Sequence, residues 1–464
     1  MRPWRALLGA AAAVVLLVWI DAQVKRAPIP GYCPQSTTWV AAAEDFGRFY
    51  QGLEQCDAAK ALSDHVPRDL FDYQLAVRKA TGIRPTPLRW RVWMGNAFLA
   101  GVAPEGVGFC TRPGLLLRAA DALRRRFVRP VHGGRVFTLG RLFYGWRNGF
   151  LIVSPSHRYV TASLEADVPE VAASRARDEL RVHALRDRRA VVRIRAADGL
   201  PVSGWVAGAV TKRNAPLSLP DAWPEAPLIS VSASRWADLA RLPLWIHSAA
   251  APGHVWPPWL EGVVETASEQ WRVDRLPEDW DAGVRECSLA VMDVDTEEVT
   301  PVPEVAVVLR ADGSAHGPHP LEPLAPEGQT IPYEWNGQPG LLAPWLGEKL
   351  TVCLGSYDRD WLATSQEPVM NDLIGALRPA DPVEADVVVR VNWQELAATA
   401  GVLVRKAADF ELIPRMNAQD AQKRLIPFLR AASELGSARL EGRCRGDRIA
   451  FRGFLARPRP GPEE

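Results

Sequence analysis

Two tryptophans on a proline-stiffened loop are the residues whose type and spacing best suit recognition of a partner. Trp256 and Trp259 enclose two prolines within residues 251–260. An exposed indole can stack on a sugar ring or anchor a protein partner, because it offers a large contact area with little loss of conformational freedom. The alternative is that both rings pack in the core, as most tryptophans do. We take Trp256 and Trp259 as the candidate ligand- or partner-binding residues.

Histidine pairs come nearest to the spacing of a metal site. His316 and His319 enclose a Gly-Pro pair, and His247 and His254 form a second pair. Zinc needs three or four convergent ligands, and the first pair lies in a Pro-rich loop with no cysteine or carboxylate cluster beside it. The chain also lacks a phosphate-binding Gly-rich loop with its lysine, and the HExxH, GxSxG and SxxK motifs. We therefore expect no metal, no cofactor and no catalytic residues.

Arginines are the remaining groups that could do chemistry. Arg158 with Tyr159, and Arg359 with Trp361, could each hold a carboxylate or phosphate in an active site, or simply pack at a corner between a strand and a helix. The Arg-rich stretches 124–135 and 175–195 could contact lipid head groups or a cell-wall polyanion. We favour solvated faces for them, because acids are interspersed.

The N-terminus indicates export. Arg2 and Arg5 precede the uncharged apolar run Ala6–Ile20, which predicts a signal anchor or signal peptide in residues 1–26. Residues 4–20 would then contact the membrane, and the body would lie outside the cytoplasm. Cleavage after Ala22 would give a secreted form instead.

Composition excludes some classes of partner. The 464 residues carry 55 Lys+Arg and 54 Asp+Glu, a formal charge of +1, so we expect no nucleic-acid partner. Six cysteines leave 15 disulfide pairings open in an exported chain. They are widely spaced, and we expect isolated core cysteines with at most one or two bridges.

Three short segments recur in the same order and indicate an internal duplication. Residues 37–49 resemble 229–239, residues 150–163 resemble 350–365, and residues 191–195 resemble 388–392. The predicted halves are 32–225 and 226–457, followed by a disordered tail at 458–464. The alternative is that unrelated strands and helix starts have similar residue patterns, so that the matches arise without a duplication.

Runs of consecutive strands and clusters of helices must position these residues. Helical patterns occur at 45–62, 68–81, 114–127, 165–186, 393–410 and 418–435, and strand patterns between them. Short turns between consecutive strands favour antiparallel pairing. The prediction is an α+β fold of two related halves, each a largely antiparallel sheet covered by helices, after one N-terminal hydrophobic helix.

This layout resembles bacterial envelope proteins that are grouped only as domains of unknown function. The resemblance rests on the layout and on segments such as Trp345–Cys353 and Arg359–Ser365. It implies no site residues. We expect a non-enzymatic, membrane-anchored envelope protein that binds a partner or ligand, such as an envelope protein or a glycan. An exported hydrolase without a recognisable motif is the alternative, and lipid transport is a third.

Overall fold

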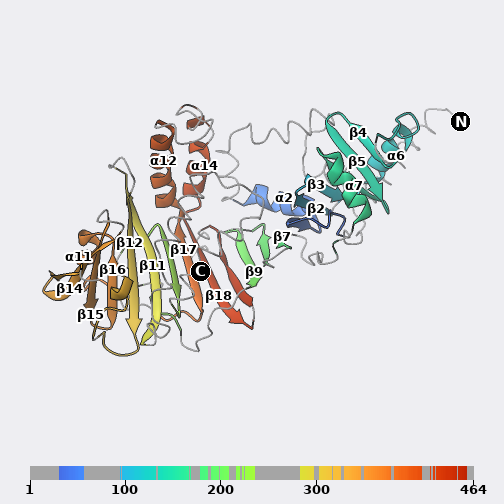
Figure 1. The fold of residues 1–464 in the computed structure, drawn as a ribbon. Coiled ribbons are helices and arrows are strands. Elements are labelled where there is room, and N and C mark those ends of the chain that lie inside the picture. Colours follow the sequence, from blue (N-terminus) through green and yellow to red (C-terminus); the bar gives the residue numbers. More distant parts are fainter. Residues whose placement is uncertain are drawn as a thin grey trace. The chain divides into compact units, whose positions relative to one another are not determined.

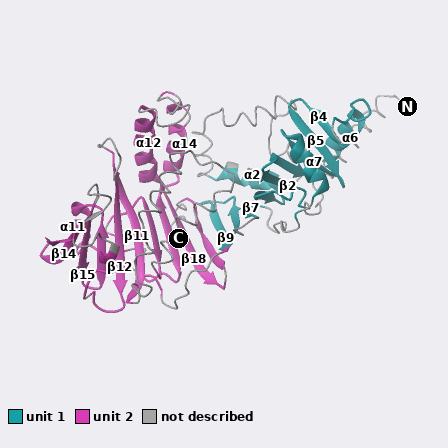
Figure 2. Cartoon of the chain, in the orientation of Figure 1, with its two compact units in different colours: residues 1–60, 66–206 teal, residues 61–65, 207–464 magenta. Residues whose placement is uncertain are grey.

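The chain divides into two compact units in the computed structural model (Figure 2). Unit 1 comprises residues 1–60 and 66–206, and unit 2 comprises residues 61–65 and 207–464. The structure describes residues 31–56, 95–235 and 283–456, with short gaps in the last two ranges. The predicted halves 32–225 and 226–457 stay predictions as regards their boundaries.

Unit 1 is built on one antiparallel sheet. Its strands follow the spatial order β4-β5-β6-β3-β2-β1-β7-β8-β9. The strands are β1 (Trp39–Ala43), β2 (Phe98–Ala103), β3 (Gly106–Thr111), β4 (Val136–Leu139), β5 (Leu142–Arg147), β6 (Phe150–Ser154), β7 (Glu179–Ala184), β8 (Ala190–Arg195) and β9 (Pro201–Ala207). The helices are α2 (Phe46–Gln55), α6 (Leu115–Arg124) and α7 (His157–Glu165).

Unit 2 is also built on one antiparallel sheet, in the order β13-β14-β15-β16-β12-β11-β10-β17-β18-β19. The strands are β10 (Ile229–Ala233), β11 (Val284–Asp295), β12 (Val302–Ala311), β13 (Ile331–Trp335), β14 (Gln338–Trp345), β15 (Leu350–Tyr357), β16 (Asp360–Thr364), β17 (Val387–Asn392), β18 (Ser437–Arg445) and β19 (Arg448–Phe454). The helices are the 3-10 turn η2 (Glu322–Leu324), α11 (Glu367–Leu373), α12 (Trp393–Asp409) and α14 (Ile426–Ser433) (Figure 1).

The two sheets have the same strand order, with β13 as an addition in unit 2. Their hairpin registers also correspond. Gly145 faces Ile152 across β5 and β6, and Gly355 faces Leu362 at the same place across β15 and β16. The turns of both hairpins contain a non-glycine residue with positive φ, Asn148 in one and Asp358 in the other. A duplication would produce this shared connectivity.

Two of the three sequence matches nevertheless joined the wrong strands. Residues 150–154 form β6, whose counterpart by strand order is β16 and not the matched segment 350–354, which lies in β15. Residues 191–195 lie in β8, whereas 388–392 lie in β17, the counterpart of β7. Apolar strands look alike in sequence, and the cross-strand partner decides which ones correspond.

The expected α+β fold with sheets covered by helices is wrong. Among the residues that the structure describes, strand outweighs helix, at 45% against 23%, and antiparallel sheets dominate both units. Helix α7 packs only on the β3–β6 side of its sheet, and α12 packs mainly on α14. One expected helix, 165–186, contains β7 instead, because Glu179–Ala184 pairs with β1 on one side and β8 on the other. Pairing overrides local helix preference there.

The expected transmembrane signal anchor is also corrected. Among the residues that the structure describes, no helix combines the length and the apolar composition that a bilayer crossing requires. Residues 1–26, on which the expectation rested, lie outside the described residues, as does the tail at 458–464.

Tight packing on glycine fixes the position of α7 in unit 1. Tyr159 of α7 is 1% exposed and lies over the facing glycines Gly101 and Gly108 of β2 and β3. A Cβ at Gly108 would come within 2.2 Å of the Tyr159 ring. All six cysteines are buried free thiols, as expected of core residues.

Candidate functional site

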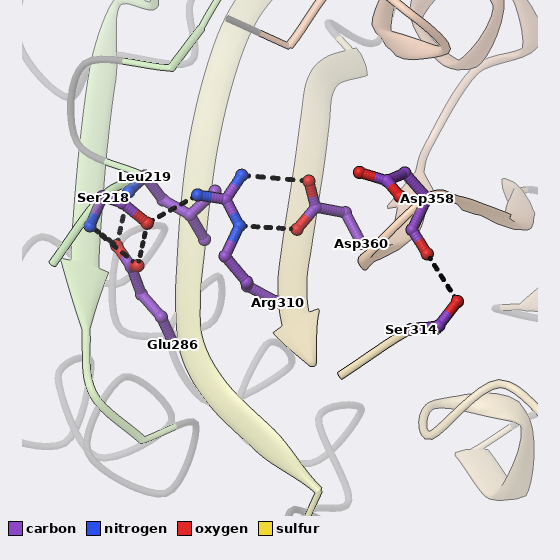
Figure 3. Close-up of polar contacts among 7 residues, drawn as sticks. All are labelled: Ser218, Leu219, Glu286, Arg310, Ser314, Asp358 and Asp360. Atoms are coloured by element: carbon purple, nitrogen blue, oxygen red, sulfur yellow. Dashed lines mark hydrogen bonds and ion pairs between the residues drawn. The ribbon is translucent and has the colours of Figure 1, made fainter. Parts of the chain in front are cut away.

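A row of charged side chains crosses three neighbouring strands of unit 2 (Figure 3). Glu286 of β11 faces Arg310 of β12, which faces Asp360 of β16, so all three side chains lie on one face of the sheet. The Arg310 guanidinium donates two hydrogen bonds to the Asp360 carboxylate, at 2.8 and 3.0 Å. A third bond runs from Arg310 to the Ser218 hydroxyl.

Glu286 holds the chain segment that crosses this face. Its carboxylate accepts hydrogen bonds from the backbone N–H of Ser218 at 2.8 Å, from that of Leu219 and from the Ser218 hydroxyl at 2.9 Å. Burial raises the pKa of the Glu286 carboxyl above its ordinary value, although these bonds and the charge of Arg310 oppose that effect. Glu286 is 1% exposed.

The arrangement is a structural clamp. The Ser218 hydroxyl donates to Glu286 and accepts from Arg310, so its oxygen is engaged on both sides and is no free nucleophile. Asp360 is 7% exposed and neutralised by Arg310. The clamp therefore fastens residues 217–219 to the sheet. In the described part of the chain no group of three or more His, Cys, Asp or Glu side chains could hold a metal ion.

Most residues singled out from the sequence lie elsewhere. Trp256, Trp259, His247, His254 and His316 lie outside the described residues. His319 is a buried core residue, whose Nδ1 accepts from the Leu321 N–H at 3.1 Å, which leaves Nε2 to donate to the Leu362 carbonyl at 3.0 Å. Burial lowers its pKa to about 4. A neutral ring with both nitrogens bonded is a structural histidine.

The two Arg-aromatic motifs do not form equivalent sites. Arg158 is exposed on α7, whereas Arg359 is exposed in the turn between β15 and β16. Their neighbours Tyr159 and Trp361 both pack in hydrophobic cores. The packing alternative therefore fits both aromatic residues.

Exposed arginines form a basic surface at and after α6. Residues 112–147 contain nine arginines and one acid, Asp121, whereas the whole chain has a formal charge of only +1. Arg126, Arg129, Arg135 and Arg141 are exposed, and none of them forms an ion pair within the described residues. We call these four arginines, with Leu123, Phe127 and Val131, the α6 surface.

A buried hub at Asp121 fastens α6 to the strands beneath it. Its carboxylate accepts hydrogen bonds from the Tyr144 hydroxyl and the Trp146 indole, both at 2.7 Å, and pairs with Arg125 at 2.8 Å. Arg124 donates to the Thr138 carbonyl and to the Tyr144 hydroxyl. The acid nearest to the α6 surface is therefore already neutralised, and the helix end is held rigidly against β4 and β5.

The second Arg-rich stretch is only partly solvated, since Arg195 is exposed whereas Arg181 and Arg193 are half-buried. Arg181 pairs with Glu179 at 2.8 Å, and Arg195 pairs with Asp178 at 3.4 Å. The interspersed acids that favour a solvated face lie only in residues 175–195, and residues 124–135 contain none. Counting acids separately around each stretch would have distinguished them.

Comparison with known proteins gives no match to a family model, to a curated protein or to a solved structure. The resemblance to bacterial envelope proteins therefore stays a prediction.

Proposed function

We propose that this protein is a binding protein that holds an anionic partner at the α6 surface. The observation that carries the proposal is that Arg126, Arg129, Arg135 and Arg141 are exposed without an ion pair among the described residues, while the one acid of residues 112–147, Asp121, is buried and already paired. The remainder of the chain is net acidic. Such an asymmetry attracts anions to one place on the molecule and raises their rate of association.

The rigid hub supports binding rather than catalysis. Arginines on a fixed helix end and hairpin can donate bidentate hydrogen bonds to phosphate, sulfate or carboxylate groups. The hydrolase alternative, the glycan or protein partner at Trp256 and Trp259, and the envelope location stay predictions.

Salt-dependent retention on immobilised heparin tests the proposal, with the full chain. The double variant Arg126→Glu, Arg129→Glu should elute at clearly lower salt than the wild type, because attraction between exposed charges is screened by ions. Arg445→Glu is the matched control, since Arg445 is exposed at the end of β18 in unit 2. Equal elution of all three proteins would contradict the proposal.

A further inference from the structure

Helix α6 presents apolar side chains to solvent and turns its acid inward. Leu123 is 59% exposed, and Phe127, just after the helix, is 81% exposed. Ala119, Leu123 and Phe127 are spaced four residues apart, so they follow one side of the helical path. Asp121 is 8% exposed and faces the strands. A surface helix normally has the opposite arrangement.

The hydrophobic core beneath the helix does not include these apolar residues. Leu117 packs there with Phe137, Leu139, Leu142 and Trp146, around the buried Tyr144, Leu151 and Val153. The hydrogen bonds of Asp121 and Arg124 hold the end of the helix in place. These bonds fix the helix end from which the chain continues to Phe127. Clustered exposed apolar side chains of this kind mark a surface that another phase or partner covers.

Arginines flank the apolar side chains directly. Arg126 precedes Phe127, and Arg129 lies between Phe127 and Val131, which is 48% exposed. An anionic polymer would engage the arginines, and an RNA base could stack on Phe127, but neither has a use for the aliphatic Leu123 and Val131. A lipid bilayer uses both kinds of group. Its phosphates meet the guanidinium groups, and its acyl boundary takes up the apolar side chains.

We propose that the anionic partner is the surface of an anionic phospholipid bilayer, into which Phe127 and Leu123 insert while Arg126 and Arg129 contact lipid phosphates. This inference rests on the proposed function and adds the chemistry of the partner. The contact is peripheral, since α6 has only ten residues and lies parallel to the interface when its apolar side is buried.

Cosedimentation of the full chain with vesicles tests the inference. Binding should be stronger to phosphatidylcholine mixed with phosphatidylglycerol than to phosphatidylcholine alone. The double variant Leu123→Ser, Phe127→Ser should bind the anionic vesicles roughly tenfold more weakly or worse, because it lacks both apolar side chains that the bilayer would bury. Phe454→Ser is the matched control, since Phe454 is 41% exposed on β19. Arg126→Glu with Arg129→Glu should weaken it by roughly twentyfold or more.

A local probe separates the α6 surface from any other lipid contact, including one through the apolar run Ala6–Ile20. The six native cysteines are buried, so Ala122→Cys can be labelled selectively with an environment-sensitive fluorophore. Its emission should shift to the blue on anionic vesicles, whereas a label at Arg445→Cys should not respond. Circular dichroism of each variant checks that the fold is retained.

The outcomes distinguish this inference from the proposed function. Arginine-dependent retention on heparin without a blue shift at residue 122 would overturn the bilayer inference and leave the proposed function standing. Vesicle binding that is equal in all variants would also overturn the bilayer inference. If the wild-type protein showed neither arginine-dependent heparin retention nor a blue shift at residue 122, both proposals would be overturned.

Discussion

Arg310 and Asp360 are joined by two hydrogen bonds across the ladder between β12 and β16. In unit 1 the corresponding ladder between β3 and β6 ends at Thr111 and Leu151, and the next residues, Arg112 and Phe150, bring the guanidinium carbon to 5.7 Å from the centre of the ring. The same place in the repeated sheet therefore holds an ion pair in one unit and a cation–π contact in the other.

Replacing the arginine should have unequal effects in the two units. Arg310→Leu leaves the buried Asp360 carboxylate without its cation and should cost roughly 3–5 kcal/mol of unfolding free energy. Arg112→Leu removes only a contact with a ring and should cost about 0.5–1 kcal/mol. Urea unfolding followed by far-ultraviolet circular dichroism measures both. Arg310→Leu combined with Asp360→Leu should recover much of the loss, and equal costs for the two single variants would contradict the assignment.

Stability should depend on the protonation of His319. Its folded-state pKa of about 4 lies below the ordinary 6.5, because the ring is buried. Between these values the unfolded chain binds the proton more readily, so the unfolding free energy falls as the pH drops from 6.5 to about 4. The full shift corresponds to roughly 3 kcal/mol.

Unfolding of the wild type and of His319→Gln across this pH range measures the effect. The variant should show a shallower loss of stability on acidification. His183 in unit 1 also has a pKa lowered by burial, so part of the slope should persist. Identical slopes in the two proteins would mean that His319 is not the buried neutral residue described above.

Gly108→Ala should destabilise unit 1. The added methyl group would meet the ring of Tyr159, which is 1% exposed and packed on the facing glycines. Overpacking of this kind costs about 1–3 kcal/mol. Gly313→Ala is the control, because a Cβ there meets nothing within 4 Å, and it should change stability by less than about 0.5 kcal/mol. If Gly108→Ala left the free energy of unfolding unchanged, the close contact between Gly108 and Tyr159 would be refuted.

Thiol titration should find six unreactive cysteines in the folded protein and six reactive ones in denaturant. All six are buried as free thiols, and burial raises the pKa of Cys353 to about 11, so the reactive thiolate is scarce. A reductant should leave the unfolding midpoint unchanged. Fewer than six titratable groups in denaturant would reveal a disulfide.

Sequence patterns predicted many elements but not their partners. Alternating residues on both sides of a glycine are typical of a hairpin, and β18 and β19 pair in this way around Gly446, which takes a positive φ. The pattern at 165–186 predicted a helix, because charges and alanines mask the alternation of Glu179–Ala184. That strand forms because β1 and β8 lie on either side of it. Such long-range pairing is invisible to a local pattern.

The candidate site was foreseeable only in part. Residues 124–135 stood out for their arginines, but no local rule shows that Asp121 points inward while Leu123 and Phe127 point outward. A helical pattern with apolar residues on one side predicts that this side is buried. The hydrogen bonds of Tyr144 and Trp146 to Asp121 reverse that orientation. Trp256 and Trp259 lie outside the described residues, so their role stays a prediction.

The helices α12 and α14 leave and rejoin the sheet of unit 2 at a single point. The Trp393 N–H donates to the Gly436 carbonyl at 2.8 Å, and the adjacent Asn392 and Ser437 are cross-strand partners. Unit 1 joins the equivalent strands β7 and β8 through residues 185–189 alone. The segment that contains both helices therefore begins and ends at neighbouring positions of β17 and β18, so its length does not alter the pairing of these strands. The connection between β17 and β18 is thus an insertion site, where a segment can be added, shortened or exchanged in evolution or by design while the hydrogen bonds between the strands are kept.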